Sequence, residues 1–174
     1  MKATDLFKKN KPVLRKVQFV TDGNAGDLPY LWDQYKKGLF KDVPDDFSMA
    51  DFVEYVDVLN DSLREMWIAE DYINNELTPV ALVLCTGDGW TLEPHAIYFK
   101  NASPRVVLRT YVGFMKRTKY RKDIGACLVR VDKVAKNLAN KVEKLGLIEY
   151  VGKIWGGAPN GNQYLYSVRC GRRA

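Results

Sequence analysis

The spacing of hydrophobic residues changes several times along the first third of the chain. Residues 13–20 alternate between apolar and polar side chains, which is typical of a half-buried strand. Asp27 can cap a helix that runs to about residue 40, and apolar residues recur at helical spacing within it. The same spacing recurs in residues 48–62. Ser48 and Asp51 stand at the offset of a capping box, which marks the start of the second helix. The N-terminal third is therefore expected to be one strand followed by two helices.

Three strand-like runs follow in the middle of the chain, at residues 65–70, 79–86 and 93–99. Asn74 and Asn75 separate the first two runs, and a Gly-Asp-Gly segment at 87–89 separates the last two. These separators have the composition of tight turns. The three runs are therefore expected to form an antiparallel meander.

The last part of the chain predicts a helix, a strand, a second helix and a hairpin. Ser103 and Pro104 have the pattern of a helix start, which predicts a helix at residues 103–118. A buried strand is expected at residues 125–131. Asp132 is expected to cap the next helix, which ends at Gly146, a residue suited to the left-handed conformation after a helix. Residues 147–155 and 162–170 then predict a final hairpin around a glycine-rich loop.

The order of these elements predicts one mixed sheet. The strands at 93–99 and 125–131 are joined through a helix, so the right-handed crossover rule makes them parallel neighbours. The fold class is therefore α/β (α+β), with a mixed, mostly antiparallel sheet of about seven strands and helices on both faces. We expect residues 1–174 to form a single domain, with residues 1–12 as a flexible or extended arm.

Composition narrows the class of protein. With 174 residues, 47% of them hydrophobic and 28% charged, the chain can bury a core as one ordinary domain. Its apolar runs are too short to cross a bilayer and its basic start lacks a following apolar region, which favours an intracellular protein without membrane attachment. Three widely spaced cysteines and a single histidine favour neither a disulfide framework nor a metal site, so the cysteines are interpreted as buried core residues.

Charge is distributed unevenly. Residues 22–93 hold 16 of the 21 acidic residues and only four basic ones, whereas residues 100–122 hold eight basic residues and no acidic one. Such a basic segment favours a phosphate-bearing cofactor, a nucleic acid or an acidic protein surface as partner. A solvated helix face is the alternative interpretation.

Four segments, MWIAED, PVALVL, EPHAIYF and VEKLGL, follow one another along the chain. In this order they resemble segments of the GNAT N-acetyltransferases. MWIAED and PVALVL look like the second and third strands of that family, EPHAIYF like its fourth strand, and VEKLGL like its helix ending in YEKLGF. The stretch PHAIYFKNASPR also resembles small phage-encoded proteins of the family. The resemblance implies the GNAT fold and transfer of an acetyl group from acetyl-CoA, a coenzyme A thioester, to an amine. It also implies a location in the cytoplasm of a host cell or in a virion.

The resemblance places the candidate catalytic residues in the fourth strand, where the family often has a glutamate as general base. Glu93 and His95 are two residues apart and therefore share one face of a strand. Either could take a proton from an amine, directly or through water. Val142 stands where the family often has a tyrosine that reprotonates the leaving thiolate. Valine cannot donate a proton, so Tyr150, Tyr164 or Tyr166 is the alternative donor, although each of them also fits a core or surface aromatic.

The candidate cofactor-binding residues follow the same strand. The family holds the coenzyme pyrophosphate in a Q/R-x-x-G-x-G/A loop at a helix N-terminus, where free N–H groups suit an anion. The matching segment here is KNASPR, which has neither glycine, and Pro104 removes one N–H donor. The candidate ligands are therefore Lys100, Ser103, Arg105 and Arg109, the two arginines acting through their side chains.

Two other functions fit parts of the sequence. The first is a non-catalytic virion or assembly protein with a GNAT-like fold, which would bind phage structural proteins. The second is a winged-helix, nucleic-acid-binding protein, with residues 132–145 as recognition helix and Lys133, Lys136, Lys141 and Lys144 available to phosphates. Against the second, residues 125–131 have the pattern of a strand where a winged helix needs a supporting helix.

Overall fold

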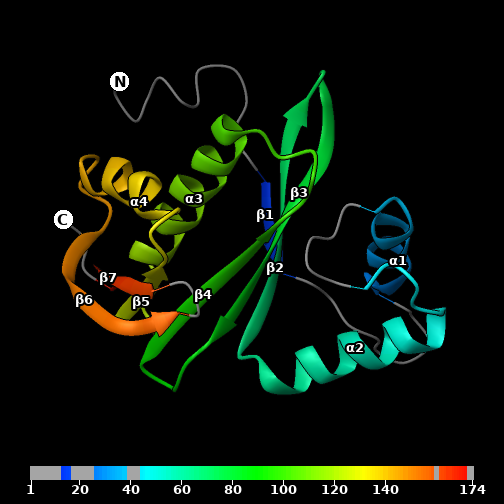
Figure 1. The fold of residues 1–174 in the computed structure, drawn as a ribbon, viewed down its shortest axis with the longest axis horizontal. Coiled ribbons are helices and arrows are strands. Elements are labelled where there is room, and N and C mark those ends of the chain that lie inside the picture. Colours follow the sequence, from blue (N-terminus) through cyan, green and yellow to red (C-terminus); the bar gives the residue numbers. More distant parts are fainter. Residues whose placement is uncertain (1–12, 17–25, 39–43, 159–160, 172–174) are drawn as a thin grey trace.

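The chain forms one seven-stranded sheet with helices on both faces (Figure 1). The structure, a computed structural model, describes residues 13–16, 26–38, 44–158 and 161–171, and the predicted arm at 1–12 lies outside them. The strand order is β1-β2-β3-β4-β5-β7-β6. In chain order the elements are β1 (Val13–Lys16), α1 (Leu28–Lys36), α2 (Met49–Ser62), β2 (Glu65–Ile73), β3 (Glu76–Thr86), β4 (Thr91–Tyr98), α3 (Pro104–Lys119), β5 (Ala126–Val131), α4 (Lys136–Glu143), β6 (Glu149–Ala158) and β7 (Gly161–Arg169).

The meander predicted for the middle of the chain is confirmed. β2 pairs antiparallel with β3, and β3 pairs antiparallel with β4. Asn74 and Asn75 both take positive φ angles, 52° and 67°, which suits the tight turn between β2 and β3. The capping box of α2 is also present, because Ser48 N donates to Asp51 Oδ2 at 2.9 Å and Asp51 N donates to Ser48 Oγ at 3.2 Å.

The second half of the chain matches the predicted order, with shifted boundaries. Ser103 caps α3 by accepting a hydrogen bond from Val106 N at 3.4 Å, as predicted. Asp132 instead accepts from Ala135 N at 2.8 Å in a turn, and α4 begins only at Lys136. The final hairpin extends into the predicted loop, since β6 continues to Ala158. β4 and β5 are parallel neighbours, and the other strand pairs are antiparallel in the part of the chain that the structure describes.

The helix cap predicted at Asp27 is wrong. Asp27 precedes α1 but its side chain makes no capping hydrogen bond, because the residue has helical φ and ψ angles (−86° and −2°) rather than the extended conformation of an N-cap. Residues 126–131 form β5, a central strand between β4 and β7, and α4 packs against the same sheet. These residues therefore do not form the winged helix of the second alternative.

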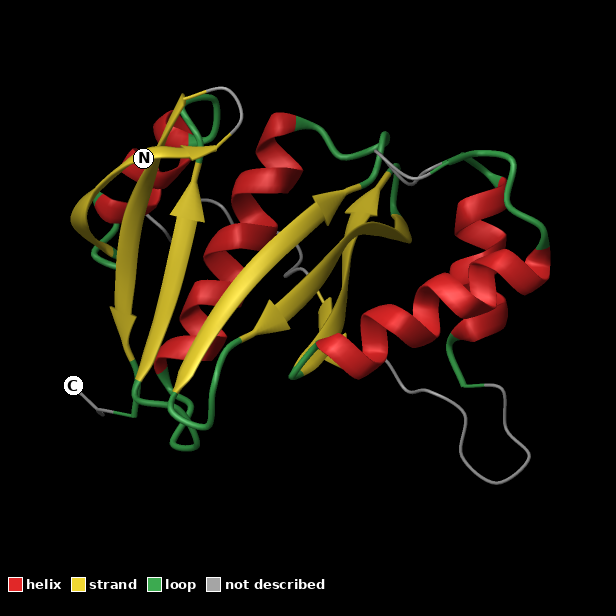
Figure 2. Cartoon of the chain, turned by 60° about the horizontal axis from the view of Figure 1, so that its bottom comes forward, coloured by secondary structure: helices red, strands yellow, loops and turns green. Residues whose placement is uncertain are grey.

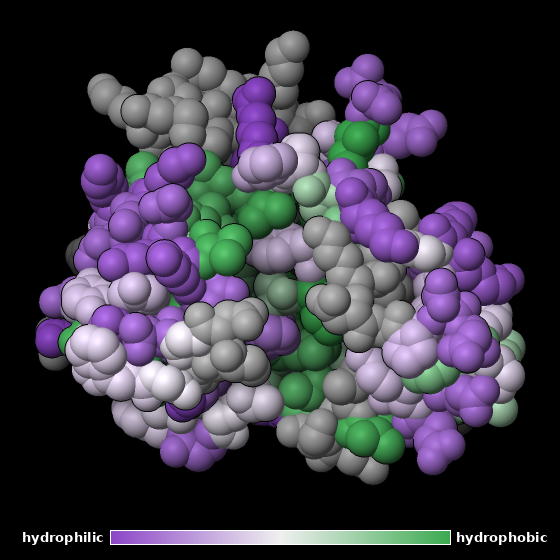
Figure 3. Space-filling view, in the orientation of Figure 1, coloured by the Kyte–Doolittle hydropathy of each residue, from purple (hydrophilic) through white to green (hydrophobic). Residues whose placement is uncertain are grey.

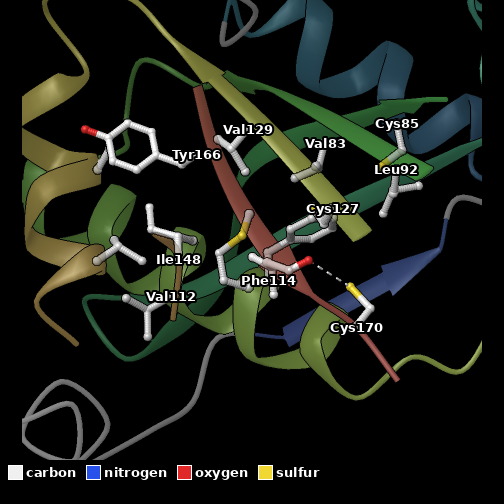
Figure 4. Packing of buried hydrophobic residues seen from close by; sticks show 14 of the residues in the cluster. Val83, Cys85, Leu92, Val112, Phe114, Cys127, Val129, Ile148, Tyr166 and Cys170 are labelled. Carbon is white, nitrogen blue, oxygen red and sulfur yellow. Dashed lines mark hydrogen bonds between the residues drawn. The ribbon is translucent and has the colours of Figure 1, made fainter. Parts of the chain in front are cut away.

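Two hydrophobic clusters, one on each face, hold the sheet between its helices. Leu31 of α1 and Phe52 of α2 pack on Ile68 and Leu82 on one face. Residues of α3 and α4 pack on the opposite face, in a cluster that Figure 4 shows from close by. Its buried members from the helices are Leu108, Val112, Phe114, Met115, Ala139 and Val142.

All three cysteines lie in the cluster under α3 and α4, as predicted from the sequence. Cys85, Cys127 and Cys170 are buried and free. Cys170 Sγ donates to the carbonyl oxygen of Val168 (Figure 4). Burial raises the pKa of the Cys127 thiol well above its usual range, so this side chain is an unreactive core group.

Candidate functional site

The sheet splits between its two parallel strands. β4 and β5 are paired only at Thr91 with Ala126 and at Leu92 with Cys127, although β4 continues to Tyr98 and β5 to Val131. Figure 2 shows the two strands side by side at one end and fanning apart toward the other, with α3 behind the opening.

Pro94 explains where the pairing ends. Phe99 N donates to Val80 O on the β3 side, at 2.9 Å. Backbone groups of a strand alternate between its two neighbours, so residues 94, 96 and 98 direct theirs toward β5. Pro94 has no N–H to donate at the first of these positions. The last pair between β4 and β5 is therefore Leu92 with Cys127, and the ladder stops at Pro94, two residues later.

The split exposes backbone groups of both strands. By the same alternation, the N–H groups of Ala96 and Tyr98 point from β4 into the opening. On the other strand, Cys170 N donates to Gly125 O at 2.9 Å, so Leu128 and Arg130 direct their backbone groups toward β4. These donors and acceptors can extend a ladder to a ligand placed between the strands.

A cavity of about 520 Å³ occupies this split. Its wall on the α3 and α4 side is mainly apolar and aromatic, and it includes Ala96, Tyr98, Thr110, Tyr111, Phe114 and Leu138. Its wall on the α1 and α2 side carries charged and polar side chains, namely Glu93, His95, Arg130 and Gln163. Side chains two apart on a strand share a face, so Ala96 and Tyr98 lie on one face of β4 and Glu93 and His95 on the other. The cavity therefore connects the two faces of the sheet through the gap between β4 and β5. Figure 3 shows apolar side chains at the centre of the molecule, between two more hydrophilic halves.

Two buried hydroxyl groups lie on the α3 side of the cavity. Thr110 is 1% exposed, and neither its Oγ1 nor the Tyr111 hydroxyl has a hydrogen-bond partner among the described residues. Burial raises the pKa of the Tyr111 phenol and of the Tyr98 phenol well above their usual range. Both phenols are therefore neutral hydrogen-bond donors at neutral pH. A buried hydroxyl without a partner is costly, which favours a polar group of a ligand at this place.

The structure brings the two candidate catalytic residues together at the opposite mouth. Glu93 is 30% exposed and lies in an ion pair, with Arg130 Nη2 at 3.1 Å from its Oε2 and donating to its Oε1 at 3.2 Å. His95 is exposed and lines the same mouth. Arg130, which the sequence analysis did not select, therefore belongs to the site.

The four candidate cofactor-binding residues do not come together. Ser103 caps α3 and Arg105 is exposed in its first turn, so these two lie at the helix N-terminus. Lys100 Nζ instead lies 3.7 Å from the place that a Cβ on Gly38 would take, at the end of α1. Arg109 forms a buried ion pair, with its Nε 3.1 Å from Asp71 Oδ2. Only Ser103 and Arg105 stand where a phosphate at the start of α3 would lie.

The tyrosines of the C-terminal hairpin do not line the cavity. Tyr166 is buried and donates to Asn140 Oδ1 at 2.8 Å, and Tyr150 packs against its ring. Val142, at the position of the family's tyrosine, is fully buried. The phenols that do line the cavity are Tyr98 and Tyr111. Tyr98 could have been found from the sequence, because it follows Ala96 at the two-residue spacing of the strand face opposite Glu93.

The described residues contain neither a cluster of metal ligands nor a helix that could span a membrane. They contain no group of three or more histidine, cysteine, aspartate or glutamate side chains that could hold a metal ion. Within the same residues, no helix is both long enough and apolar enough to span a membrane.

The fold is that of GNAT-family N-acetyltransferases. The structure is similar to that of a spermidine N-acetyltransferase from Vibrio cholerae in complex with CoA and spermine, with a TM-score of 0.59 and 13% identity over 91% of this chain and 95% of that one. RimL, a ribosomal alpha-N-protein acetyltransferase in complex with coenzyme A, has a TM-score of 0.60 and 12% identity over 94% and 96% of the two chains. A GNAT-family acetyltransferase from Bacillus anthracis has a TM-score of 0.60 and 13% identity over 92% and 95%. The predicted mixed sheet with helices on both faces is confirmed by these likenesses.

No family model matches the chain, and no curated protein matches it.

Proposed function

We propose that this GNAT-fold domain transfers an acetyl group from acetyl-CoA to an amine. The observation that carries the proposal is the cavity through the split between β4 and β5, with an apolar wall on one face of the sheet and Glu93 and His95 on the other. Such a cavity can admit two substrates from opposite faces and let them meet between the strands. The CoA-bound proteins of the same fold support a coenzyme A thioester as one of the two.

The α3 side of the cavity suits the coenzyme arm. That arm is a flexible chain with amide groups, and the N–H groups of Ala96 and Tyr98 can donate to its carbonyl oxygens. The hydroxyl groups of Thr110 and Tyr111 can take the remaining polar groups. At the start of α3, the side chain and backbone N–H of Arg105 suit a phosphate, with Ser103 capping the first turn through Val106 N. We leave Lys100 and Arg109 out of this site because of their positions at α1 and Asp71.

The opposite mouth suits the amine. Acetyl-CoA supplies an electrophilic carbonyl carbon, and the amine must lose a proton as its nitrogen bonds to that carbon. Glu93 or His95 takes this proton, directly or through water, because both side chains lie on the α1 and α2 side of the cavity. The bond between carbon and sulfur then breaks, and the sulfur leaves with the electron pair. The phenol of Tyr98 or Tyr111 is a neutral proton donor for that sulfur.

Binding and turnover test the proposal separately. One millimolar acetyl-CoA should raise the melting temperature, since a ligand at about 100 times its Kd stabilises the folded state by about 2.7 kcal/mol. Turnover of acetyl-CoA with a pool of amines should release free thiol, and this rate should fall about 100-fold or more in E93Q or in H95Q. E149Q changes an exposed carboxylate on β6 and serves as the matched control. No thermal shift with acetyl-CoA would overturn the proposal.

The same assays address the non-catalytic alternative. Binding without turnover for any amine, in a protein that co-purifies in fixed ratio with a larger assembly, is the result expected of an assembly protein with this fold. Because Glu93, His95 and two cavity phenols are all present at the split, catalysis is the function we favour.

A further inference from the structure

Arg130 stands on the acceptor side of the cavity with most of its donors unused. Its guanidinium contacts Glu93 through Nη2 alone. Nε and Nη1 have no hydrogen-bond partner among the described residues, and the side chain is 49% exposed while it lines the cavity. An arginine has five N–H donors in a planar fork that matches a carboxylate. The free edge of this fork is therefore available to a ligand in the mouth.

We propose that the amine acceptor carries a carboxylate, as a free amino acid does, and that Arg130 binds that carboxylate. The inference rests on the proposed acetyl transfer and names the substrate class for the same site. With its carboxylate on Arg130, the acceptor presents its amino group to Glu93 and His95, the two residues placed to remove a proton. Arg130 is then a specificity-determining residue for the reaction.

Charge complementarity supports an acceptor with both signs of charge. Glu93 on β4 and Arg130 on β5 form a pair across the split, with about a third and a half of their side chains exposed. An amino acid offers one positive and one negative group. Glu93 can therefore exchange Arg130 for the ligand ammonium group, and Arg130 can exchange Glu93 for the ligand carboxylate. An acceptor with an amine alone satisfies Glu93 and leaves Arg130 without a new partner.

The surroundings of Arg130 fit a carboxylate. Gln163 lies on the same sheet face, since Arg130 is in register with Leu165, two residues away on β7. Its amide can donate to the second carboxylate oxygen. Asp132 is the remaining carboxylate in the wall, and its Oδ1 accepts a hydrogen bond from Ala135 N at 2.8 Å within the turn. The exposed carboxylates on α2, Asp51, Glu54 and Asp57, are solvated and do not line the cavity.

Matched acceptor pools test the inference. Thiol release from acetyl-CoA is measured with a pool of the twenty amino acids, with the pool of their C-terminal amides, and with spermidine, for the wild-type protein, R130M, R130K and R169M. Arg169 is exposed on the same sheet, and Met there changes the net charge equally at the far end of β7. Thermal unfolding of each variant shows that it is folded.

The expected result is a preference for the amino acids over the amides in the wild-type protein and in R169M. That ratio of kcat/KM values should fall about ten- to hundredfold in R130M, because a charged hydrogen-bonded contact is lost. R130K should recover part of the ratio, since a lysine keeps the charge without the fork. Equal use of acids and amides by the wild-type protein, or a preference for spermidine, would overturn the carboxylate acceptor and leave acetyl transfer standing. No turnover with any pool would overturn both.

Discussion

Replacing Arg109 by methionine separates a structural role from a role in cofactor binding. The guanidinium Nε lies 3.1 Å from Asp71 Oδ2, and the two side chains are 13% and 1% exposed. R109M removes the cation and leaves a buried carboxylate, whose described hydrogen bond is with Tyr72 N at 2.8 Å. An uncompensated buried charge costs about 3–5 kcal/mol.

The assay is thermal unfolding. For a domain of this size, each kcal/mol shifts the melting temperature by about 2–4 °C, so R109M should melt about 6–20 °C below the wild-type protein. R105M is the control on the same helix. Arg105 is exposed, and its loss should change the free energy of unfolding by about 0.5 kcal/mol or less. The double variant D71L/R109M, which removes both charges, should recover much of the loss.

The two variants should rank in the opposite order for their affinity for coenzyme A. R105M should weaken the affinity about tenfold through the lost phosphate contact, and R109M should leave it near that of the wild-type protein at a temperature where the variant is folded. An R109M protein as stable as R105M would contradict the structural role of Arg109. A loss of coenzyme affinity in R109M that R105M does not show would contradict it as well.

Three further outcomes follow from the described contacts. G87A should lower the free energy of unfolding by about 2–3 kcal/mol, because this residue has a φ of +119° and a Cβ there would clash with the Thr91 carbonyl. G89A, in the same turn and with no atom near the added Cβ, should leave the free energy of unfolding nearly unchanged in chemical denaturation. Equal losses of stability in G87A and G89A would contradict a clash specific to residue 87. All three cysteines should resist an aromatic disulfide reagent in the native protein and react after unfolding, whereas rapid native labelling would show an exposed thiol. The Arg121 guanidinium lowers the pKa of Asp123 to about 2, so the stability from this pair is complete above the ordinary pKa near 3.8 and is lost as pH falls from about 4 to 2. Because Asp123 is largely exposed, this loss of stability should be under about 1 kcal/mol. Urea titrations at about pH 4 and about pH 2 measure it, and D123N should lack this part of the difference between the two pH values.

The order of elements was predictable because local rules determine it. The turn at Asn74 and Asn75, the capping box at Ser48 and the proline at the start of α3 each specify a backbone conformation within a few residues. Boundaries were less predictable. α4 begins four residues after Asp132, since that side chain closes a turn instead of the first helical turn.

Part of the site was predictable and part was not. The two-residue spacing placed Glu93 and His95 on one face of β4, and both residues line the cavity. The pairing of Glu93 with Arg130 depends on where β5 lies relative to β4, and no local pattern specifies that distance. Arg109 was selected as a phosphate ligand for its position near the start of α3, but the helix directs its side chain to Asp71 on β2. Such a contact, 38 residues apart in sequence, is visible only in the fold.

A calorimetric titration of acetyl-CoA into the wild-type protein and into A96W tests whether the coenzyme binds in the split between β4 and β5. Ala96 lies in the cavity wall on β4, so a tryptophan there should fill the space between the strands. We predict one bound acetyl-CoA per wild-type chain and no heat of binding for A96W, with both proteins unfolding cooperatively. Absence of binding to the wild-type protein, or equal binding to a folded A96W, would contradict a coenzyme site in the split sheet.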